Sequence, residues 1–171
     1  MVEKTPQSGH DGPYPAPVEV RGFTVRPEWI DYNGHMNVGY YGVAFDKALD
    51  VMLEEQLGLG KTYVETAGAG PYILQSHVQF RREILEGEGF HLHFRLLDHD
   101  AKRIVYFAEM YADRDGVLCA SQEALIMNVS QETGRGAPFP DWAQARLARM
   151  QVKHETIPAH PAIGAALGIR R

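Results

Sequence analysis

Residues 29–49 read WIDYNGHMNVGYYGVAFDKAL, and this stretch decides the fold because a tight polar loop leads directly into a long amphipathic segment. Asn33 and Gly34 favour a turn, since both residue types tolerate positive φ. Asn37 suits the N-cap of a helix, where its side-chain oxygen accepts a hydrogen bond from an unpaired amide of the first turn. The loop therefore places the carboxylate of Asp31 close to the positive end of a helix dipole.

The amphipathic segment predicts one long helix over residues 38–57. Its apolar side chains recur every three or four residues, and its charged side chains fall largely elsewhere on the helix. The apolar stripe consists of Val38, Tyr41, Phe45, Leu49 and Met52. We expect the helix to stop at residues 58–60, which read Gly-Leu-Gly.

Five segments predict strands: residues 19–27, 72–82, 89–98, 103–112 and 117–129. Residues 66–70 are expected to be a loop, and residues 141–151 a short helix. Alternation within residues 89–98 predicts an apolar face, while the intervening polar residues His91, His93 and Arg95 point to solvent. Alternation within residues 72–82 likewise puts Tyr72, Leu74, Val78 and Phe80 on one face. The expected fold class is α+β, with one long helix wrapped by a five-stranded antiparallel sheet.

The composition fits one compact domain. The chain has 171 residues, of which 44% are apolar and 23% are charged, enough for one substantial core. Residues 1–18 are rich in Pro, Gly and charge, so we expect a flexible arm. Residues 19–152 would form the domain, and residues 153–171 a C-terminal tail.

Charge and hydropathy exclude several classes of partner. The net charge of −5 argues against generic nucleic-acid or anionic-membrane binding, both of which need a basic surface. No segment approaches the roughly 20 apolar residues of a membrane span, and the N-terminus lacks the apolar core of a signal peptide. Cys119 is the single cysteine, with no basic partner near it in sequence, and we interpret it as a buried small side chain. A soluble, cytoplasmic protein is expected.

Residues 31–37, Asp-Tyr-Asn-Gly-His-Met-Asn, resemble the Asp-x-x-Gly-His-x-Asn signature of hotdog-fold acyl-CoA thioesterases of the 4-hydroxybenzoyl-CoA thioesterase type. The resemblance runs from about residue 23 to residue 130. Residues 96–103 and 137–140 also resemble the betainyl-CoA thioesterase branch of that superfamily. The chain departs from this branch at Gln75, where an acidic residue is common, and at residues 128–130, which read Asn-Val-Ser instead of His-Val-Asp.

The resemblance implies hydrolysis of a small acyl-CoA thioester, without a cofactor, by a homodimer or homotetramer whose site lies at the subunit boundary. Asp31 would attack the thioester carbonyl or activate water, and both routes stay open. Asn33 would orient the water or the carboxylate. His35 would brace the loop or act as a base. The amides of Val38 and Gly39 would bind the developing oxyanion.

The resemblance also directs attention to substrate contacts. Aromatic rings attract quaternary ammonium groups, so Trp29, Tyr32, Tyr40, Tyr41 and Tyr72 could enclose a cationic acyl group, with Gln75 and His77 beside them. Core packing is the alternative for these rings. The phosphates of coenzyme A would contact Arg81, Arg82, Lys102 and Arg103. Solvated turn charges are the alternative for these four residues.

No metal site is expected, because His91 and His93 share a strand face without a third ligand at a recurring metal spacing. Two other functions compete with the thioesterase. A hotdog hydratase or dehydratase would move protons at the β-carbon of an acyl-CoA. A non-catalytic acyl-binding module would keep the fold but would not need the carboxylate of Asp31.

Overall fold

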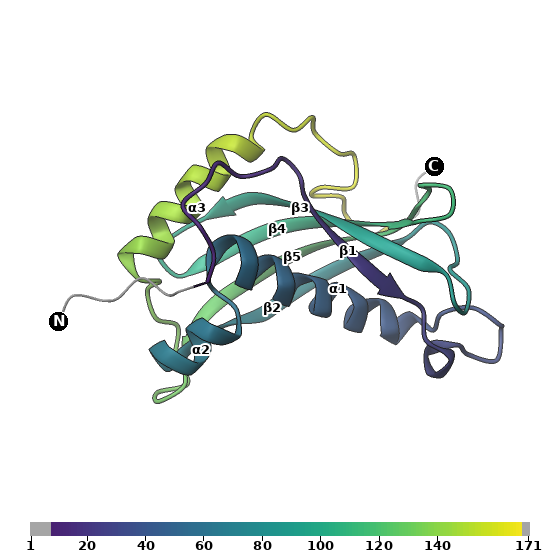
Figure 1. The fold of residues 1–171 in the computed structure, drawn as a ribbon, viewed down its shortest axis with the longest axis horizontal. Coiled ribbons are helices and arrows are strands. Elements are labelled where there is room, and N and C mark those ends of the chain that lie inside the picture. Colours follow the sequence, from purple (N-terminus) through teal and green to yellow (C-terminus); the bar gives the residue numbers. More distant parts are fainter. Residues whose placement is uncertain (1–7, 169–171) are drawn as a thin grey trace.

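The computed structural model describes residues 8–168. A five-stranded antiparallel sheet has the strand order β1-β3-β4-β5-β2, and helices cover one of its faces (Figure 1). The strands are β1 (Val18–Thr24), β2 (Ala69–Phe80), β3 (Gly89–His99), β4 (Arg103–Ala112) and β5 (Leu118–Ser130). The helices are α1 (Val38–Met52), α2 (Lys61–Ala67) and α3 (Asp141–His154). The predicted fold class is confirmed.

Helix α1 forms where the apolar stripe predicted it. Asn37 caps its first turn, and the last turn continues as a π-helix, η2 (Leu53–Leu57), which ends at Gly58 with φ of 70°. The side chains that face the sheet are buried and include Tyr41, Ala44, Phe45, Ala48, Leu49 and Met52. Val38 does not belong to this stripe, because 63% of its surface is exposed.

Strand β3 supplies the centre of the core, with Phe90, Leu92 and Phe94 buried as the alternation predicted. Strand β2 departs from its predicted alternation. A register shift between Ile73 and Gln75 marks a β-bulge, which reverses the faces on either side of it. Phe80 therefore reaches α1 and contacts Tyr41, whereas Tyr72 lies opposite Met127 on the outer face.

Residues 61–70 were incorrectly predicted in part, because the expected loop at 66–70 is divided between α2 and β2. Residues 66 and 67 belong to the seven-residue helix α2, and residues 69 and 70 begin β2. Gly68, with φ of 62°, is the single residue between the two elements. The short amphipathic turn of α2 gave no clear periodicity of its own. Helix α3 extends three residues beyond its predicted end at residue 151.

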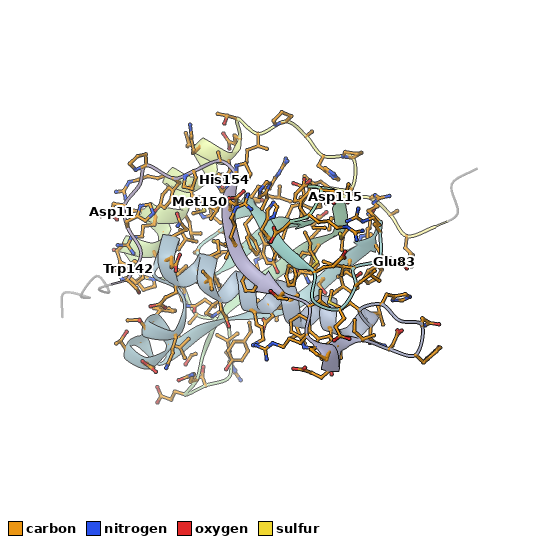
Figure 2. All side chains as sticks on the ribbon, turned by 45° about the vertical axis from the view of Figure 1, so that its right-hand side comes forward. Asp11, Glu83, Asp115, Trp142, Met150 and His154 are labelled. Carbon is orange, nitrogen blue, oxygen red and sulfur yellow. The ribbon has the colours of Figure 1, made fainter. Side chains whose placement is uncertain are left out.

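The described part of the expected N-terminal arm, residues 8–17, packs against the domain. Tyr14 is 4% exposed, and Arg146 of α3 donates to Asp11 and to the backbone oxygen of Ser8. Figure 2 shows Asp11 and Trp142 at one end of the molecule, with Glu83 and Asp115 at the other. This segment is therefore held in place rather than loose, while residues 1–7 lie outside the described residues.

The C-terminal segment crosses the outer face of the sheet, the face opposite α1. Arg95 donates to the backbone oxygen of Pro158, the His160 ring packs on Phe107, and the Gly164 amide donates to Glu123. These contacts pass from β3 over β4 to β5. As a result Arg95 is buried. His91, further along β3, is buried as well and contacts Asp113 and Tyr111. Both findings are contrary to the expectation that these side chains face solvent. No helix within residues 8–168 is long and apolar enough to cross a membrane.

Candidate active site

The loop between η1 (Pro27–Trp29) and α1 folds back on itself around Gly34. The Asp31 amide donates to the backbone oxygen of His35 at 3.1 Å, and the Gly34 amide donates to the backbone oxygen of Asp31 at 3.0 Å. Gly34 has φ of 84°, a conformation that L side chains rarely adopt. The sequence Asn-Gly thus closes a tight turn that holds Asp31 at a fixed distance from α1.

The carboxylate of Asp31 is tied to the start of the helix through Asn37. Asp31 Oδ1 accepts from the Asn33 amide at 2.8 Å, and Oδ2 lies 3.4 Å from the donating side-chain nitrogen of Asn37. The side-chain oxygen of Asn37 accepts in turn from the Gly39 amide at 2.9 Å. Asn33 therefore orients the carboxylate through its backbone, and its side chain is exposed.

Backbone contacts attach the loop to the core. The Met36 amide donates to the backbone oxygen of Ile84, and the Asn37 amide donates to that of Trp29. Trp29 is buried and stacks on Tyr40 with the ring centroids 5.7 Å apart. The loop that carries Asp31 is consequently anchored at both ends.

A cavity of about 310 Å³ opens beside this loop at the N-terminus of α1. Its lining comprises His35, Met36, Val38, Tyr41, Phe80, Arg81, Arg82 and Glu83. Burial raises the pKa of Tyr41 to about 12, so its hydroxyl stays neutral. The structure thus brings together His35, Val38, Tyr41 and the Arg81–Arg82 pair, all of which the sequence singled out.

The two expected oxyanion donors differ in availability. The Gly39 amide already donates to Asn37, whereas the Val38 amide has no acceptor among the described residues. Val38 is therefore the better oriented free donor at the positive end of the helix. His35 is half-buried, and its Nδ1 lies 3.3 Å from the backbone oxygen of Met36.

The four basic residues expected at coenzyme A fall into two separate pairs. Arg81 and Arg82 follow the last residue of β2. Arg103 of β4 and Tyr72 of β2 are both in register with Met127 of β5, so Arg103 lies near the first residues of β2. Eight residues of strand separate Tyr72 from Phe80, about 26 Å. One protomer therefore does not bring Arg81 and Arg82 together with Lys102 and Arg103.

These basic side chains also differ in how they are engaged. Arg82 forms a two-point ion pair with Asp115, at 2.7 and 3.1 Å, and Arg103 pairs with Asp100. Arg81 is exposed and donates to the side-chain oxygen of Gln79. Arg81 is thus the freer cation at the cavity mouth.

The expected aromatic cage is not assembled within one protomer. Trp29 and Tyr41 are buried on the helix side, whereas Tyr32 is 97% exposed at the loop tip and Tyr72 lies on the outer face of the sheet. Gln75 and His77 line a different cavity, of about 380 Å³, on that outer face, together with Glu123. The β-bulge in β2 is the physical reason that Tyr72 lies on the outer face.

A larger cavity, about 770 Å³, lies along the second half of α1, and none of the expected catalytic residues lines it. Asp46, Asp50 and Glu54 line it on the helix side and Ile73 on the side of β2. The smaller cavity differs from it: His35 of the Asp31 loop, Val38 with its free amide and Arg81 all line it, while the Asp31 side chain itself is not among the lining residues.

Sequence reasoning missed three features of the site. Asn37 was identified only as a helix cap, although it stands in the same motif as Asp31. Phe80 and Glu83 line the cavity through strand pairing, which no local pattern reveals. Cys119 has no basic residue near it in sequence, but strand pairing brings its sulfur to 3.8 Å from Arg82 Nη2. Burial still raises the pKa of the Cys119 thiol, so it remains an unreactive core residue.

Comparison with known proteins identifies the family. The sequence profile of the Thioesterase-like superfamily matches residues 25–147. A betainyl-CoA thioesterase of Pseudomonas aeruginosa is 30% identical over 145 residues, which cover 85% of this chain and 91% of that protein. The chain belongs to the thioesterase-like superfamily. A bifunctional L-carnitine dehydrogenase/betainyl-CoA thioesterase of Rhizobium meliloti is 28% identical over 91% of this thioesterase and 31% of the larger protein.

Solved structures agree on the fold. A Staphylococcus aureus protein of unassigned function, solved in complex with CoA, superposes on this thioesterase with a TM-score of 0.79 at 23% identity, covering 93% of this chain and 100% of the other. A DHNA-CoA thioesterase of the same species superposes with a TM-score of 0.68 at 19% identity, covering 84% and 96%. The hotdog fold, the superfamily and the function of an acyl-CoA thioesterase, all predicted from the sequence, are confirmed.

Proposed function

We propose that this thioesterase hydrolyses a small acyl-CoA at the cavity beside the N-terminus of α1, with Asp31 as the reacting carboxylate. The observation that carries the proposal is the chain of contacts from Asp31 through Asn37 to the Gly39 amide. It fixes a carboxylate next to the helix end where negative charge is stabilised. A thioester carbonyl carbon between the two would face both the attacking group and an oxyanion donor.

The reaction balances in either of two routes. In the first, Asp31 takes a proton from water, the hydroxide adds to the thioester carbon, and the C–S bond breaks to release CoA thiolate, which is then protonated. In the second, Asp31 itself adds to the carbon, the C–S bond breaks to release CoA thiolate, which is then protonated, and water hydrolyses the resulting mixed anhydride to regenerate Asp31 and give the free acid. In both routes the carbonyl oxygen gains negative charge beside the Val38 amide, and loss of such a donor typically lowers the rate about 100- to 1000-fold.

The CoA phosphates would lie at the cavity mouth, where Arg81 is exposed and lightly engaged. Arginine suits phosphate because its planar fork donates two parallel hydrogen bonds. Arg82, held by Asp115, contributes a fixed positive charge behind it. This arrangement directs the thioester toward Asp31 from the solvent side.

We further propose a homodimer formed through β2. Its edge is unpaired, and the apolar side chains Tyr72, Ile73 and Leu74 are 40 to 51% exposed there. Antiparallel pairing of two β2 strands about an axis near Ser76 would bring the Tyr72 end of the strand in the partner subunit beside the Phe80 end of this one. Lys102 and Arg103 of the partner subunit would then lie two strands beyond the β2 strand of that subunit, a distance of about 10 Å. The residues that one protomer separates would meet at this boundary.

For the acyl group we propose a betainyl-like cation, on the similarity to betainyl-CoA thioesterases. Tyr72 of the partner subunit would stay on the outer face, so the ring faces that line the cavity for a cation are those of Tyr41 and Phe80. Gln75 lacks the charge that is common in the branch, which weakens the attraction for a cation. A cytoplasmic location is also proposed, since an unpaired cysteine fits a reducing compartment.

Thiol release from a panel of acyl-CoAs tests the function directly. The panel would include betainyl-CoA, a neutral branched acyl-CoA of similar size, and short-chain, aromatic and long-chain thioesters. Saturable thiol release from at least one of them is expected. Absence of release from every thioester, by a folded protein that still binds CoA, would point to a non-catalytic binding module.

The role of Asp31 has its own test. Asp31→Asn keeps the size of the side chain but removes the charge, so turnover should fall by about 100-fold or more while the melting temperature is unchanged. Glu28→Gln, which neutralises an exposed carboxylate three residues earlier, serves as the matched control and should keep full activity. Near wild-type turnover by folded Asp31→Asn would remove Asp31 from the mechanism.

The cation proposal predicts a selectivity. A desolvated trimethylammonium group against ring faces gains on the order of 2 kcal/mol, so kcat/KM for betainyl-CoA should exceed that for the neutral branched acyl-CoA about 30-fold. The two values are measured under identical ionic strength. Equal values, or a preference for the neutral substrate, would refute the cation site while leaving thioester hydrolysis in place.

A further inference from the structure

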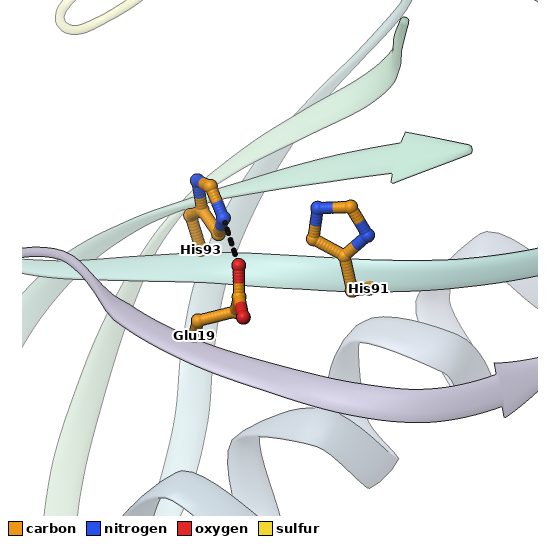
Figure 3. Close-up of side chains that lie close together, drawn as sticks. All are labelled: Glu19, His91 and His93. Carbon is orange, nitrogen blue, oxygen red and sulfur yellow. Dashed lines mark hydrogen bonds and ion pairs between the residues drawn. The ribbon is translucent and has the colours of Figure 1, made fainter. Parts of the chain in front are cut away.

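Three side chains that bind metals well lie together on the outer face of the sheet, at the edge formed by β1 and β3. Glu19 of β1 is in register with His93 of β3, and His91 lies two residues before His93 on β3. One donor atom from each lies within 4.8 Å of the other two. Within residues 8–168 this is the single group of three such residues, and Figure 3 shows the two rings on the same side of β3 as Glu19.

The orientation of His91 suits a metal ligand. Its Nδ1–H donates to Asp113 Oδ1 at 2.5 Å, which fixes the ring and leaves Nε2 as the atom with a free lone pair. Figure 3 shows that one ring nitrogen of His91 lies on the side of His93 and Glu19. Metal-bound histidines almost always donate their other ring nitrogen to a carboxylate or carbonyl in this manner.

The cluster is also rigid on one side and open on the other. His91 is buried and stacks on Tyr111, whose ring centroid lies 4.9 Å from that of His93. Glu19 is exposed, and its carboxylate lies against Arg21 on one side and His93 on the other. An ion would therefore find two oriented imidazoles, one charged oxygen and access for water.

We propose that Glu19, His91 and His93 form a binding site for Zn²⁺ or a chemically similar divalent transition metal. Two imidazoles and a carboxylate are a recurring zinc ligand set, with water in the fourth tetrahedral position. The site is separate from the catalytic cavity, because these side chains project from the face of the sheet opposite α1.

The geometry requires only small movements. Zinc bonds of about 2.0–2.1 Å place tetrahedral ligands about 3.4 Å apart, so atoms now within 4.8 Å must close by less than about 1.5 Å. His93 Nε2 and Glu19 Oε2 are already 3.0 Å apart. On binding, the His93 proton moves to Nδ1 and Nε2 becomes a ligand. Arg21, which pairs with Glu19, competes with the ion for the carboxylate.

The position of the site gives the ion a structural role. Strand β1 is an edge strand that pairs only with β3, and its ladder is interrupted by a register shift between Val20 and Phe23. An ion bound to Glu19 and to the β3 histidines joins the two strands through their side chains. Such an ion stabilises the folded state because the three ligands are not assembled in the unfolded chain.

Titration of the full chain, without a polyhistidine tag, with ZnCl₂ and with CoCl₂ tests the proposal. Calorimetry should show one equivalent of Zn²⁺ bound with a dissociation constant of about 1 µM or below, and Co²⁺ should give the visible absorption of a tetrahedral ion. Glu19→Gln and His93→Gln should each weaken binding about 100-fold, and Zn²⁺ should raise the melting temperature of the wild type but not of these two variants. His99→Gln, which alters a histidine on the β3–β4 turn side, is the matched control and should bind as the wild type does.

Two further variants separate this site from incidental binding. Asp113→Asn should lower zinc affinity about 10- to 100-fold by removing the partner that orients His91. Arg21→Gln should raise it, because the competing cation is lost. No saturable zinc binding by the folded wild type, or binding that Glu19→Gln and His93→Gln leave unchanged, would overturn the proposal.

Discussion

Asn37 performs two tasks that usually fall to separate residues. Its oxygen accepts from the Gly39 amide and thereby begins α1, while its nitrogen lies 3.4 Å from the carboxylate of Asp31. A serine at the same position would satisfy the first task but has no second arm for Asp31. Stability and catalysis can therefore be separated at this one residue.

We predict that Asn37→Ser will keep the melting temperature close to that of the wild type but lower kcat about 10-fold, since Asp31 loses its side-chain donor. Asn37→Ala should lower kcat as well and also cost about 1 kcal/mol of unfolding free energy through loss of the cap. Steady-state kinetics and urea unfolding of both variants provide the measurement. Equal kcat for Asn37→Ser and the wild type would show that the contact with Asp31 is not used.

At this scale the sequence predicted the site where its residues are close along the chain. Asp31, Gly34 and Asn37 lie in one motif whose turn and cap chemistry are local, and the structure shows that turn and that cap. Glu19 and His93 are 74 positions apart, so their meeting depends on strand register. No periodicity within either strand contains this information.

At the scale of the elements, too, patterns local in sequence predicted α1 well and β2 only in part. Helical periodicity identified the face of α1 that packs on the sheet, because repeated spacing averages over many residues. The alternation in β2 failed at one bulge, since a single extra residue reverses every side chain beyond it. Short α2 was missed because two turns are too few to establish a period.

For α1 we predict a large difference between its two faces. Phe45 is fully buried against the sheet, so Phe45→Ala should cost about 3 to 5 kcal/mol of unfolding free energy through lost transfer energy and a cavity. Lys47 is exposed two residues later, so Lys47→Ala should change the unfolding free energy little. Urea midpoints of the two variants give the comparison, and similar midpoints would show that the helix faces are assigned wrongly.

On the scale of the whole molecule, His154 joins three parts of the chain. Its Nδ1 accepts from the Leu96 amide of β3 at 2.8 Å, and its Nε2–H donates to the backbone oxygen of Pro15 at 2.9 Å. Burial, followed by the nearby charge of Arg95, lowers the pKa of His154 below its ordinary value. The folded state therefore favours the neutral ring, whose Nδ1 must stay free of a proton to accept.

We predict acid sensitivity from this arrangement. Below the ordinary pKa of about 6.5 the unfolded chain binds a proton that the folded chain resists, so stability is complete above that pH and falls as the pH drops. The slope from this one group is at most about 1.4 kcal/mol per pH unit. Urea unfolding of the wild type and of His154→Gln at about pH 7.5 and about pH 5.5 measures it. A wild type and a variant with parallel pH profiles would contradict the assignment to His154.

The proposed dimer also belongs to this scale. Leu74→Lys places a charge on the exposed edge of β2, where two copies would face each other across the axis, and should convert a dimer of 19.2 kDa chains to monomers. Activity should fall about 10-fold or more with it, if the partner subunit completes the site. Val152→Lys, at an apolar residue of α3 that is 69% exposed, is the control. Light scattering gives the mass of each, and monomers with full activity would place the whole site in one chain.

The C-terminal segment that crosses β3, β4 and β5 limits the number of chains that can assemble. Two sheets can stack back to back only through bare outer faces, and here the chain's own residues 158–164 already occupy that surface. Assembly beyond the proposed dimer would first require residues 158–164 to leave this surface. A chain shortened to residue 157 should therefore expose this apolar face and form larger particles as its concentration rises, whereas the 171-residue chain should not.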